Sequence, residues 1–209
     1  MENHTFNIFN DTDKAATFAA SLIESESKAA IANNGQFNLV LTGGSSPLKL
    51  HKLLSQAPFN KSIDWEKVHI FWGDERFVPY ESEISNTRMA YETLLNNLDI
   101  PSRQIHEMDT NAKDVATAAL SYEKAIKSLF KTSPSFDMIL LGVGDDGHTA
   151  SLFPGTPVVY EKDKLVATSY NKQQETERIT LTAPLINEAK LIIPMVFGEK
   201  KAKTLKEVI

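Results

Sequence analysis

The sequence predicts an α/β fold in which a mostly parallel sheet carries helices on both faces, as a Rossmann-like three-layer sandwich. Three observations predict it. Apolar runs of strand length occur at 37–41, 68–72 and 136–141, and helical patterns separate them. Each run ends in a short polar segment that contains glycine. No internal repeat or long linker divides residues 1–209, so we expect one domain.

Local signals place the elements in order. Asp11 or Thr12 can cap a first helix, and Gly35 can end it. Pro47 suits the start of a second helix, and Ser85 that of a third. The predicted strands are 5–10, 37–41, 68–72, 136–141, 165–169, 178–181 and 191–196. Helices are predicted after residue 11, after 47, from 85, at 112–130, at 185–189 and from 199 onward.

Polar residues follow the predicted strands at 42–47, 73–76 and 142–148. The carboxyl ends of parallel strands meet at one edge of a sheet, and such folds bind their ligands there. We therefore expect these three loops to converge into one site.

The first loop, 43–47, reads Gly-Gly-Ser-Ser-Pro and favours an anion. Its glycines permit close backbone approach, and the serines add hydroxyl donors. The helix that follows presents free N–H groups at its positive end, which suits a phosphate group. The alternative is a tight turn with a serine cap and no ligand.

The second loop holds Asp74, Glu75 and Arg76. Arg76 can bind a phosphate or carboxylate through two hydrogen bonds, and either acidic residue can orient Arg76 or a histidine. The alternative is a surface ion-pair cluster that contributes little to stability.

The third loop matches G-x-G-x-x-G at 142–147, but Asp145 and Asp146 would face a pyrophosphate, so we reject a dinucleotide site. His148 follows, and a carboxylate two residues away can fix its tautomer for general acid–base catalysis. Asp145, Asp146 and His148 could also be metal ligands. No motif such as H-E-x-x-H is present, and we expect no metal. Ser151 lies outside G-x-S-x-G, which argues against a serine nucleophile.

The other histidines and the later cations give weaker signals. Four histidines are expected to be structural or solvated: His4, His51, His69 and His106. Arg178 opens a predicted strand and could point to a different edge, and Lys201 begins the last helix. Lys172 lies in a polar stretch that could close over the site. Each of these cations could equally be a surface charge.

Composition limits the class of protein. The 209 residues include no cysteine, which excludes disulfides, thiolate metal sites and a cysteine nucleophile. The net charge of -5 argues against nucleic-acid binding. No apolar run reaches the roughly 20 residues that span a bilayer, and the N-terminus lacks the apolar segment of a signal peptide. We expect a cytoplasmic protein with no membrane partner, with Trp65 and Trp72 in or beside its core.

Four stretches of the chain resemble 6-phosphogluconolactonases, which share their fold with glucosamine-6-phosphate deaminase and ribose-5-phosphate isomerase. The stretches occur in the family's order over nearly the whole chain, and the third is the most specific. They are LTGGSSP at 41–47, WGDER with VP and SNTRM at 72–89, GVGDDGHTASLFPG at 142–155 and RITLT at 178–182. The segment 151–154, Ser-Leu-Phe-Pro, stands where the deaminases carry an asparagine-containing segment.

Three features depart from the family's pattern. Ser46 stands where threonine is common, and Phe197 precedes Gly198 where threonine is frequent, which removes one hydroxyl expected near the phosphate. The chain stops at Ile209 within a helix that family members continue, so its C-terminal end is expected to be incomplete.

The resemblance implies hydrolysis of a sugar-phosphate lactone, 6-phospho-D-glucono-1,5-lactone, to 6-phosphogluconate in the pentose phosphate pathway, without metal or organic cofactor. His148 would act as general base on a water molecule, Asp146 would orient His148, and Arg76 would hold the substrate or stabilise the oxyanion. The implied binding residues are Gly43, Gly44, Ser45, Ser46, Asp74, Glu75, Lys172, Arg178 and Lys201.

Several points stay open from the sequence. The sequence does not decide which cation binds the phosphate and which binds the lactone end of the substrate. A monomer or weak homo-oligomer is expected. The alternative functions are a glucosamine-6-phosphate deaminase or sugar-phosphate isomerase, and a non-catalytic sugar-phosphate sensor.

Overall fold

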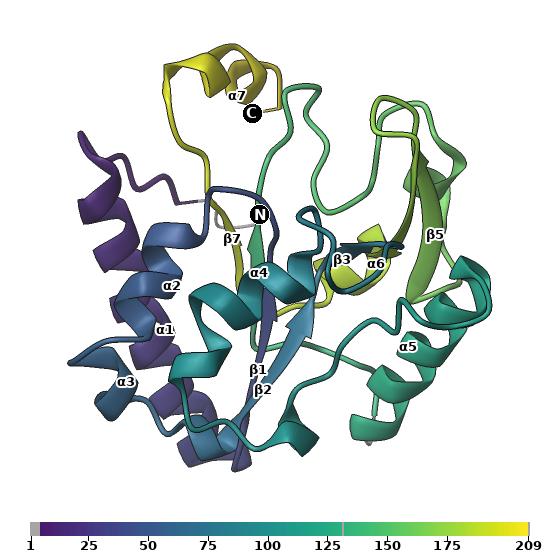
Figure 1. The fold of residues 1–209 in the computed structure, drawn as a ribbon. Helices are drawn as coiled ribbons and strands as arrows, with labels where there is room; N and C mark the ends of the chain where they lie inside the picture. The colour runs from purple at the N-terminus through teal and green to yellow at the C-terminus, as the bar shows by residue number, and fades with distance from the viewer. Residues whose placement is uncertain (1–4, 131, 209) are drawn as a thin grey trace.

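A four-stranded parallel sheet lies at the centre of the molecule (Figure 1). The computed structural model describes residues 5–130 and 132–208. The strands are β1 (Phe37–Leu41), β2 (Val68–Trp72), β4 (Met138–Leu141) and β7 (Ile192–Pro194). Their order across the sheet is β2-β1-β4-β7, and each neighbouring pair is parallel. The parallel sheet predicted from the apolar runs is confirmed.

Helices cover this sheet on both sides, as predicted. They are α1 (Thr12–Asn34), α2 (Leu48–Leu54), α3 (Phe59–Ser62), α4 (Asn86–Thr93), α5 (Val115–Leu129), α6 (Ala183–Asn187) and α7 (Ala202–Val208). In Figure 1, α1, α2 and α3 group on one side of the sheet, and α5 lies on the other side beside β5. Short 3-10 helices that the sequence did not predict occur at Trp65–Lys67, Leu95–Asn97, Ser102–Gln104 and Pro157–Tyr160. The helix predicted from residue 199 onward begins as a 3-10 turn at Glu199–Lys201 and continues as α7.

Side-chain caps set the helix ends where the sequence predicts them. The carboxylate of Asp11 accepts a hydrogen bond from Lys14 N at 2.7 Å, and α1 ends at Gly35 with φ 80°. The Ser85 side chain likewise caps α4. The long helix expected at 112–130 begins only at Val115, because Asp114 is its cap.

A second, antiparallel sheet corrects the prediction at residues 73–76. Its strands are β3 (Asp74–Arg76), β6 (Thr176–Leu181) and β5 (Val166–Asn171), in the order β3-β6-β5. The sequence predicts a loop at 73–76, whereas residues 74–76 form a strand because their backbone pairs with β6. Only Gly73 separates the end of β2 from the start of β3, so one stretch of chain joins both sheets.

The strand predicted at residues 5–10 is wrong. The structure describes these residues without strand or helix. Phe6 is 60% and Ile8 90% exposed, so the apolar side chains that suggested a strand have no buried face to occupy.

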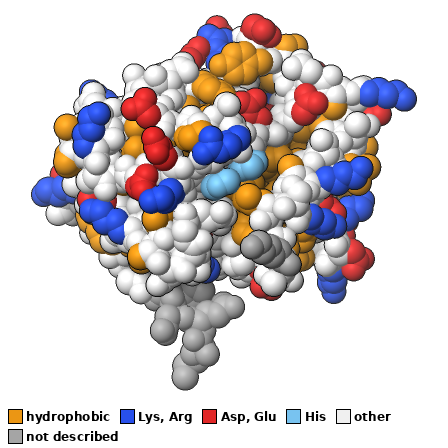
Figure 2. Space-filling view, turned by 90° about the horizontal axis from the view of Figure 1, so that it is seen from below, with side chains coloured by type: hydrophobic (Ala, Val, Ile, Leu, Met, Phe, Trp, Pro, Cys, Tyr) orange, Lys and Arg blue, Asp and Glu red, His pale blue; other side chains and the backbone are white. Residues whose placement is uncertain are grey.

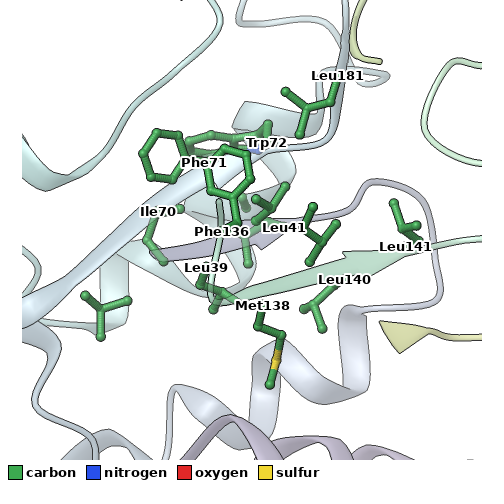
Figure 3. Packing of buried hydrophobic residues seen from close by; sticks show 14 of the residues in the cluster. Leu39, Leu41, Ile70, Phe71, Trp72, Phe136, Met138, Leu140, Leu141 and Leu181 are labelled. Atoms are coloured by element: carbon green, nitrogen blue, oxygen red, sulfur yellow. The ribbon is translucent and has the colours of Figure 1, made fainter. Parts of the chain in front are cut away.

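The core fills the space between the central sheet and its covering layers (Figure 3). Phe71 and Phe136 contact each other edge to face, with ring centroids 4.9 Å apart. Trp65 and Trp72 are both buried, which confirms their predicted place. At the open edge of β2, the Tyr122 hydroxyl accepts from Trp72 N at 2.9 Å and donates to Trp72 O at 3.2 Å.

The surface carries charges of both signs. On the face shown in Figure 2, Lys and Arg side chains are intermixed with Asp and Glu side chains, and hydrophobic side chains lie between them. Among the residues that the structure describes, no helix has the length and apolar character needed to cross a membrane.

Candidate active site

His148 and Asp146 form a hydrogen-bonded pair in the turn after β4. His148 Nδ1 lies 2.5 Å from Asp146 Oδ1, and the same oxygen accepts from His148 N at 3.1 Å. Burial alone would raise the pKa of Asp146, but the hydrogen bonds from His148 outweigh it and hold that pKa below its usual value. A neutral His148 that donates from Nδ1 leaves Nε2 as the acceptor, which is the arrangement of a general base.

The glycines of this turn make room for the pair. A Cβ at Gly144 would overlap the His148 ring and lie 2.8 Å from Asp146 Oδ1. Gly147 has φ 82°, a conformation that favours glycine, and Gly144 N donates to His148 O at 2.8 Å to close the turn. The spacing that resembles a dinucleotide motif is therefore explained by the geometry of the His148 turn.

The C-terminal helix is attached to the same turn. Lys201 Nζ lies 2.5 Å from Asp145 Oδ1, and Thr204 Oγ1 donates to Asp145 O at 2.9 Å. The hydrogen bond and charge of Lys201 lower the pKa of Asp145. Lys201, expected to support a phosphate, thus lies next to the His148 turn and pairs with a carboxylate that is 90% exposed.

An open cleft of about 230 Å³ joins the glycine-serine loop to Arg76. Its lining residues are Gly44, Ser45, Leu48, Arg76, Glu83, Ser85, Asn86 and Met89. Gly44 has φ 78°, and Gly43 leaves no room for a Cβ because the Asn86 amide packs against it. The loops at 42–47 and 73–76 therefore line one cleft, as predicted. Ser46 is half-buried and is not among the lining residues.

Arg178 lies beside Arg76. The sequence alone did not exclude that Arg178 points to a different edge of the sheet from the other candidate residues. The two residues are cross-strand partners in the β3–β6 ladder, and Arg178 is only 2% exposed. Burial and the nearby charge of Arg76 lower the pKa of Arg178 to about 10, against the opposing effect of Asp74 and Glu75. Within the described ranges, neither guanidinium forms an ion pair with a carboxylate, and the Nε of each is buried without a hydrogen-bond partner. This pair concentrates positive charge at the site.

Glu75 is directed into the protein. It is fully buried, and its carboxylate accepts from Asn86 N at 2.8 Å, Thr87 N at 2.7 Å and Arg76 N at 2.7 Å. Burial raises the pKa of Glu75, and these backbone hydrogen bonds counteract part of that shift. Its contacts are therefore with the N-terminus of α4, which leaves little surface for a substrate.

Asp74 is also almost buried, at 8% exposed. Its Oδ2 accepts from Ser151 Oγ at 2.6 Å, and its backbone oxygen accepts from Asn86 Nδ2 at 2.9 Å. Asn86 and Ser151 are the site residues that sequence reasoning missed. Asn86 could have been found from its position after the Ser85 cap, but nothing local to Ser151 indicates its distant partner.

The remaining predicted residues lie elsewhere. Lys172 is exposed in the turn between β5 and β6, and no hydrogen bond or ion pair links it to the other candidate residues in the part of the chain described. His51 is buried against Thr93, and His69 Nδ1 lies 2.9 Å from His106 Nε2. His4 lies outside the described residues. In residues 5–130 and 132–208, no three His, Asp or Glu side chains are grouped to hold a metal ion.

Comparison with known proteins shows the family of the chain. A family model described as glucosamine-6-phosphate isomerases/6-phosphogluconolactonase matches residues 10–209. A 6-phosphogluconolactonase from Synechocystis sp. is 43% identical over 183 residues, which cover 86% of this chain and 74% of the relative. A 6-phosphogluconolactonase from Nostoc sp. is 37% identical over 202 residues, which cover 94% of this chain and 82% of the relative.

A solved structure has the same fold. The 6-phosphogluconolactonase from Trypanosoma brucei superposes with a TM-score of 0.88 at 27% identity, covering 98% of this chain and 86% of that one. The chain therefore belongs to the glucosamine-6-phosphate isomerase/6-phosphogluconolactonase family, on the 6-phosphogluconolactonase side of it.

Proposed function

We propose that this chain hydrolyses 6-phospho-D-glucono-1,5-lactone to 6-phosphogluconate. The observation that carries the proposal is the His148–Asp146 pair, which leaves Nε2 of a neutral imidazole available to accept a proton. The likeness to 6-phosphogluconolactonases supports the choice of substrate.

The reaction needs one general base and stabilisation of negative charge. His148 Nε2 takes a proton from water as the water oxygen bonds to the lactone carbonyl carbon, and the carbonyl oxygen becomes an oxyanion. The C–O bond to the ring oxygen then breaks, and the imidazolium returns its proton to that oxygen. A lactone is an activated ester, so no covalent enzyme intermediate is required.

Positive charge and N–H groups hold the anionic substrate. The loop of Gly43, Gly44, Ser45 and Ser46 accepts the phosphate, with Lys201 as a supporting cation. The paired guanidiniums of Arg76 and Arg178 favour the oxyanion or the carboxylate product. Asp74 and Glu75 position neighbouring residues and do not bind the substrate themselves, because both carboxylates are buried and accept hydrogen bonds from the protein.

The test is a lactonase assay of the purified chain at slightly acidic pH, with the spontaneous rate of lactone hydrolysis subtracted. His148→Ala is expected to lower kcat by about 10²–10⁴, the contribution typical of a general base. His69→Gln is the matched control and is expected to keep its activity, because in the described part of the chain the His69 ring pairs with His106. Near-normal activity of His148→Ala would refute the mechanism.

The same preparation separates the alternatives. Release of ammonia from glucosamine 6-phosphate without lactone hydrolysis would identify a deaminase. Binding of sugar phosphates without turnover would identify a sensor. We further propose a monomer or weak homo-oligomer, and sedimentation analysis tests this.

A further inference from the structure

Ser151 anchors the segment that carries His148. It is fully buried, and its Oγ donates to Asp74 Oδ2 at 2.6 Å. Its backbone N–H donates to Thr180 Oγ1 at 3.2 Å. Both partners lie in the second sheet, Asp74 on β3 and Thr180 on β6. The turn after β4 is therefore fixed to a sheet formed by distant parts of the chain.

The residues on each side of Ser151 show why an anchor is needed. Ala150 has φ 47°, in the left-handed region that non-glycine residues seldom adopt. Such a conformation persists only where surrounding contacts hold it in place. Two residues beyond Ser151, the Phe153 ring packs against the His148 ring with centroids 4.6 Å apart. The orientation of His148 thus depends on the path of the backbone from 148 to 153.

Asp74 extends the connection to the proposed phosphate loop. Asn86 Nδ2 donates to Asp74 O at 2.9 Å and approaches Asp74 Oδ1 at 3.4 Å. The same amide packs against Gly43 so closely that no Cβ fits there. A continuous path of contacts therefore runs from the His148 turn through Ser151, Asp74 and Asn86 to the loop at 43–46.

We propose that Ser151 is a positioning residue of the lactonase reaction. Its hydrogen bond to Asp74 sets the place of His148 relative to the loop that holds the substrate phosphate. This proposal rests on the proposed function. The physical reason is that the attacking water must lie within hydrogen-bond reach of Nε2 and in line with the carbonyl carbon. A displacement of about 1 Å can lower the rate about a hundredfold.

The first test measures kcat and KM of Ser151→Ala. We expect kcat to fall about 10- to 100-fold with KM changed less than about twofold, because the glycine-serine loop itself is untouched. Ser151→Cys keeps a weak donor and is expected to recover part of the lost kcat. Ser27→Ala is the matched control, since Ser27 is equally buried and its hydroxyl donates to Glu24 O within α1. Thermal unfolding of each variant confirms that the assays compare folded proteins.

The second test does not depend on turnover. Hydrogen exchange followed by mass spectrometry should show faster exchange in residues 142–154 of Ser151→Ala, and no change there in Ser27→Ala. The proposal is overturned if kcat of Ser151→Ala stays within twofold of wild type, if only KM changes, or if exchange at 142–154 is unaltered. A wild-type chain without lactonase activity would instead refute the proposed function, and exchange alone would then decide whether Ser151 anchors the turn.

Discussion

Gly144 allows a sharp test of whether the His148–Asp146 pair needs its observed geometry. A Cβ at this position would lie 2.8 Å from Asp146 Oδ1 and overlap the His148 ring. Ordinary van der Waals contact for a Cβ begins at 3.4 Å, so Gly144→Ala must displace Asp146 Oδ1 by about 0.6 Å and the overlapping His148 ring by more. A misplacement near 1 Å can cost about a hundredfold in rate, so we expect kcat to fall about 10- to 100-fold.

The control for this variant lies in the same loop. A Cβ at Gly142 would meet only Thr42 Oγ1, at an ordinary 3.7 Å, so Gly142→Ala is expected to keep kcat within about twofold of wild type. Steady-state lactone hydrolysis, corrected for the spontaneous reaction, gives kcat and KM for both variants, and thermal unfolding shows that both are folded. Equal activity of Gly144→Ala and Gly142→Ala would refute the reasoning.

Three further predictions concern stability and substrate binding. Tyr122→Phe removes both hydrogen bonds to the Trp72 backbone at the edge of β2, so urea denaturation should show a loss of about 1–3 kcal/mol for each buried group left without a partner. Burial lowers the pKa of His51 to about 4 in the folded state against 6.5 for the free group, so its contribution to stability is complete above pH 6.5 and is lost as the pH falls towards 4. The free energy of unfolding should therefore drop by ~2 kcal/mol at pH 5 through this group, and His51→Gln should flatten that dependence. Lys201→Ala should raise KM about tenfold with little change in kcat, because a charged hydrogen bond to phosphate contributes about 1.5–3 kcal/mol; an unchanged KM would mean that Lys201 serves only Asp145.

The central sheet could be predicted from the sequence because its signal is local. The runs at 37–41 and 68–72 are buried except at the half-buried His69, and apart from Asn38 and His69 all their residues are apolar, which is the pattern of a buried parallel strand. β3 could not be predicted in this way. Its three residues are Asp, Glu and Arg, and they form a strand only because β6, about 100 residues later, offers its edge. The run at 5–10 shows the converse, since a suitable pattern without a buried face gives no strand.

The candidate site likewise contains relationships that have a local sequence signal and relationships that have none. The dyad of Asp146 and His148 lies two residues apart, so the sequence alone could propose it. Two relationships depend on the second sheet and had no local signal. These are the neighbouring guanidiniums of Arg76 and Arg178, and the hydrogen bond from Ser151 to Asp74.

The second sheet also explains how a chain with net charge -5 can bind an anion. Asp74 and Glu75 precede Arg76, and in a simple surface cluster they would neutralise it. Here both carboxylates are occupied by hydrogen bonds from Ser151, from Asn86 and from the first N–H groups of α4. Because the acidic side chains are turned into the protein, the charge of Arg76 remains available at the cleft, and Arg178 adds a second positive charge beside it.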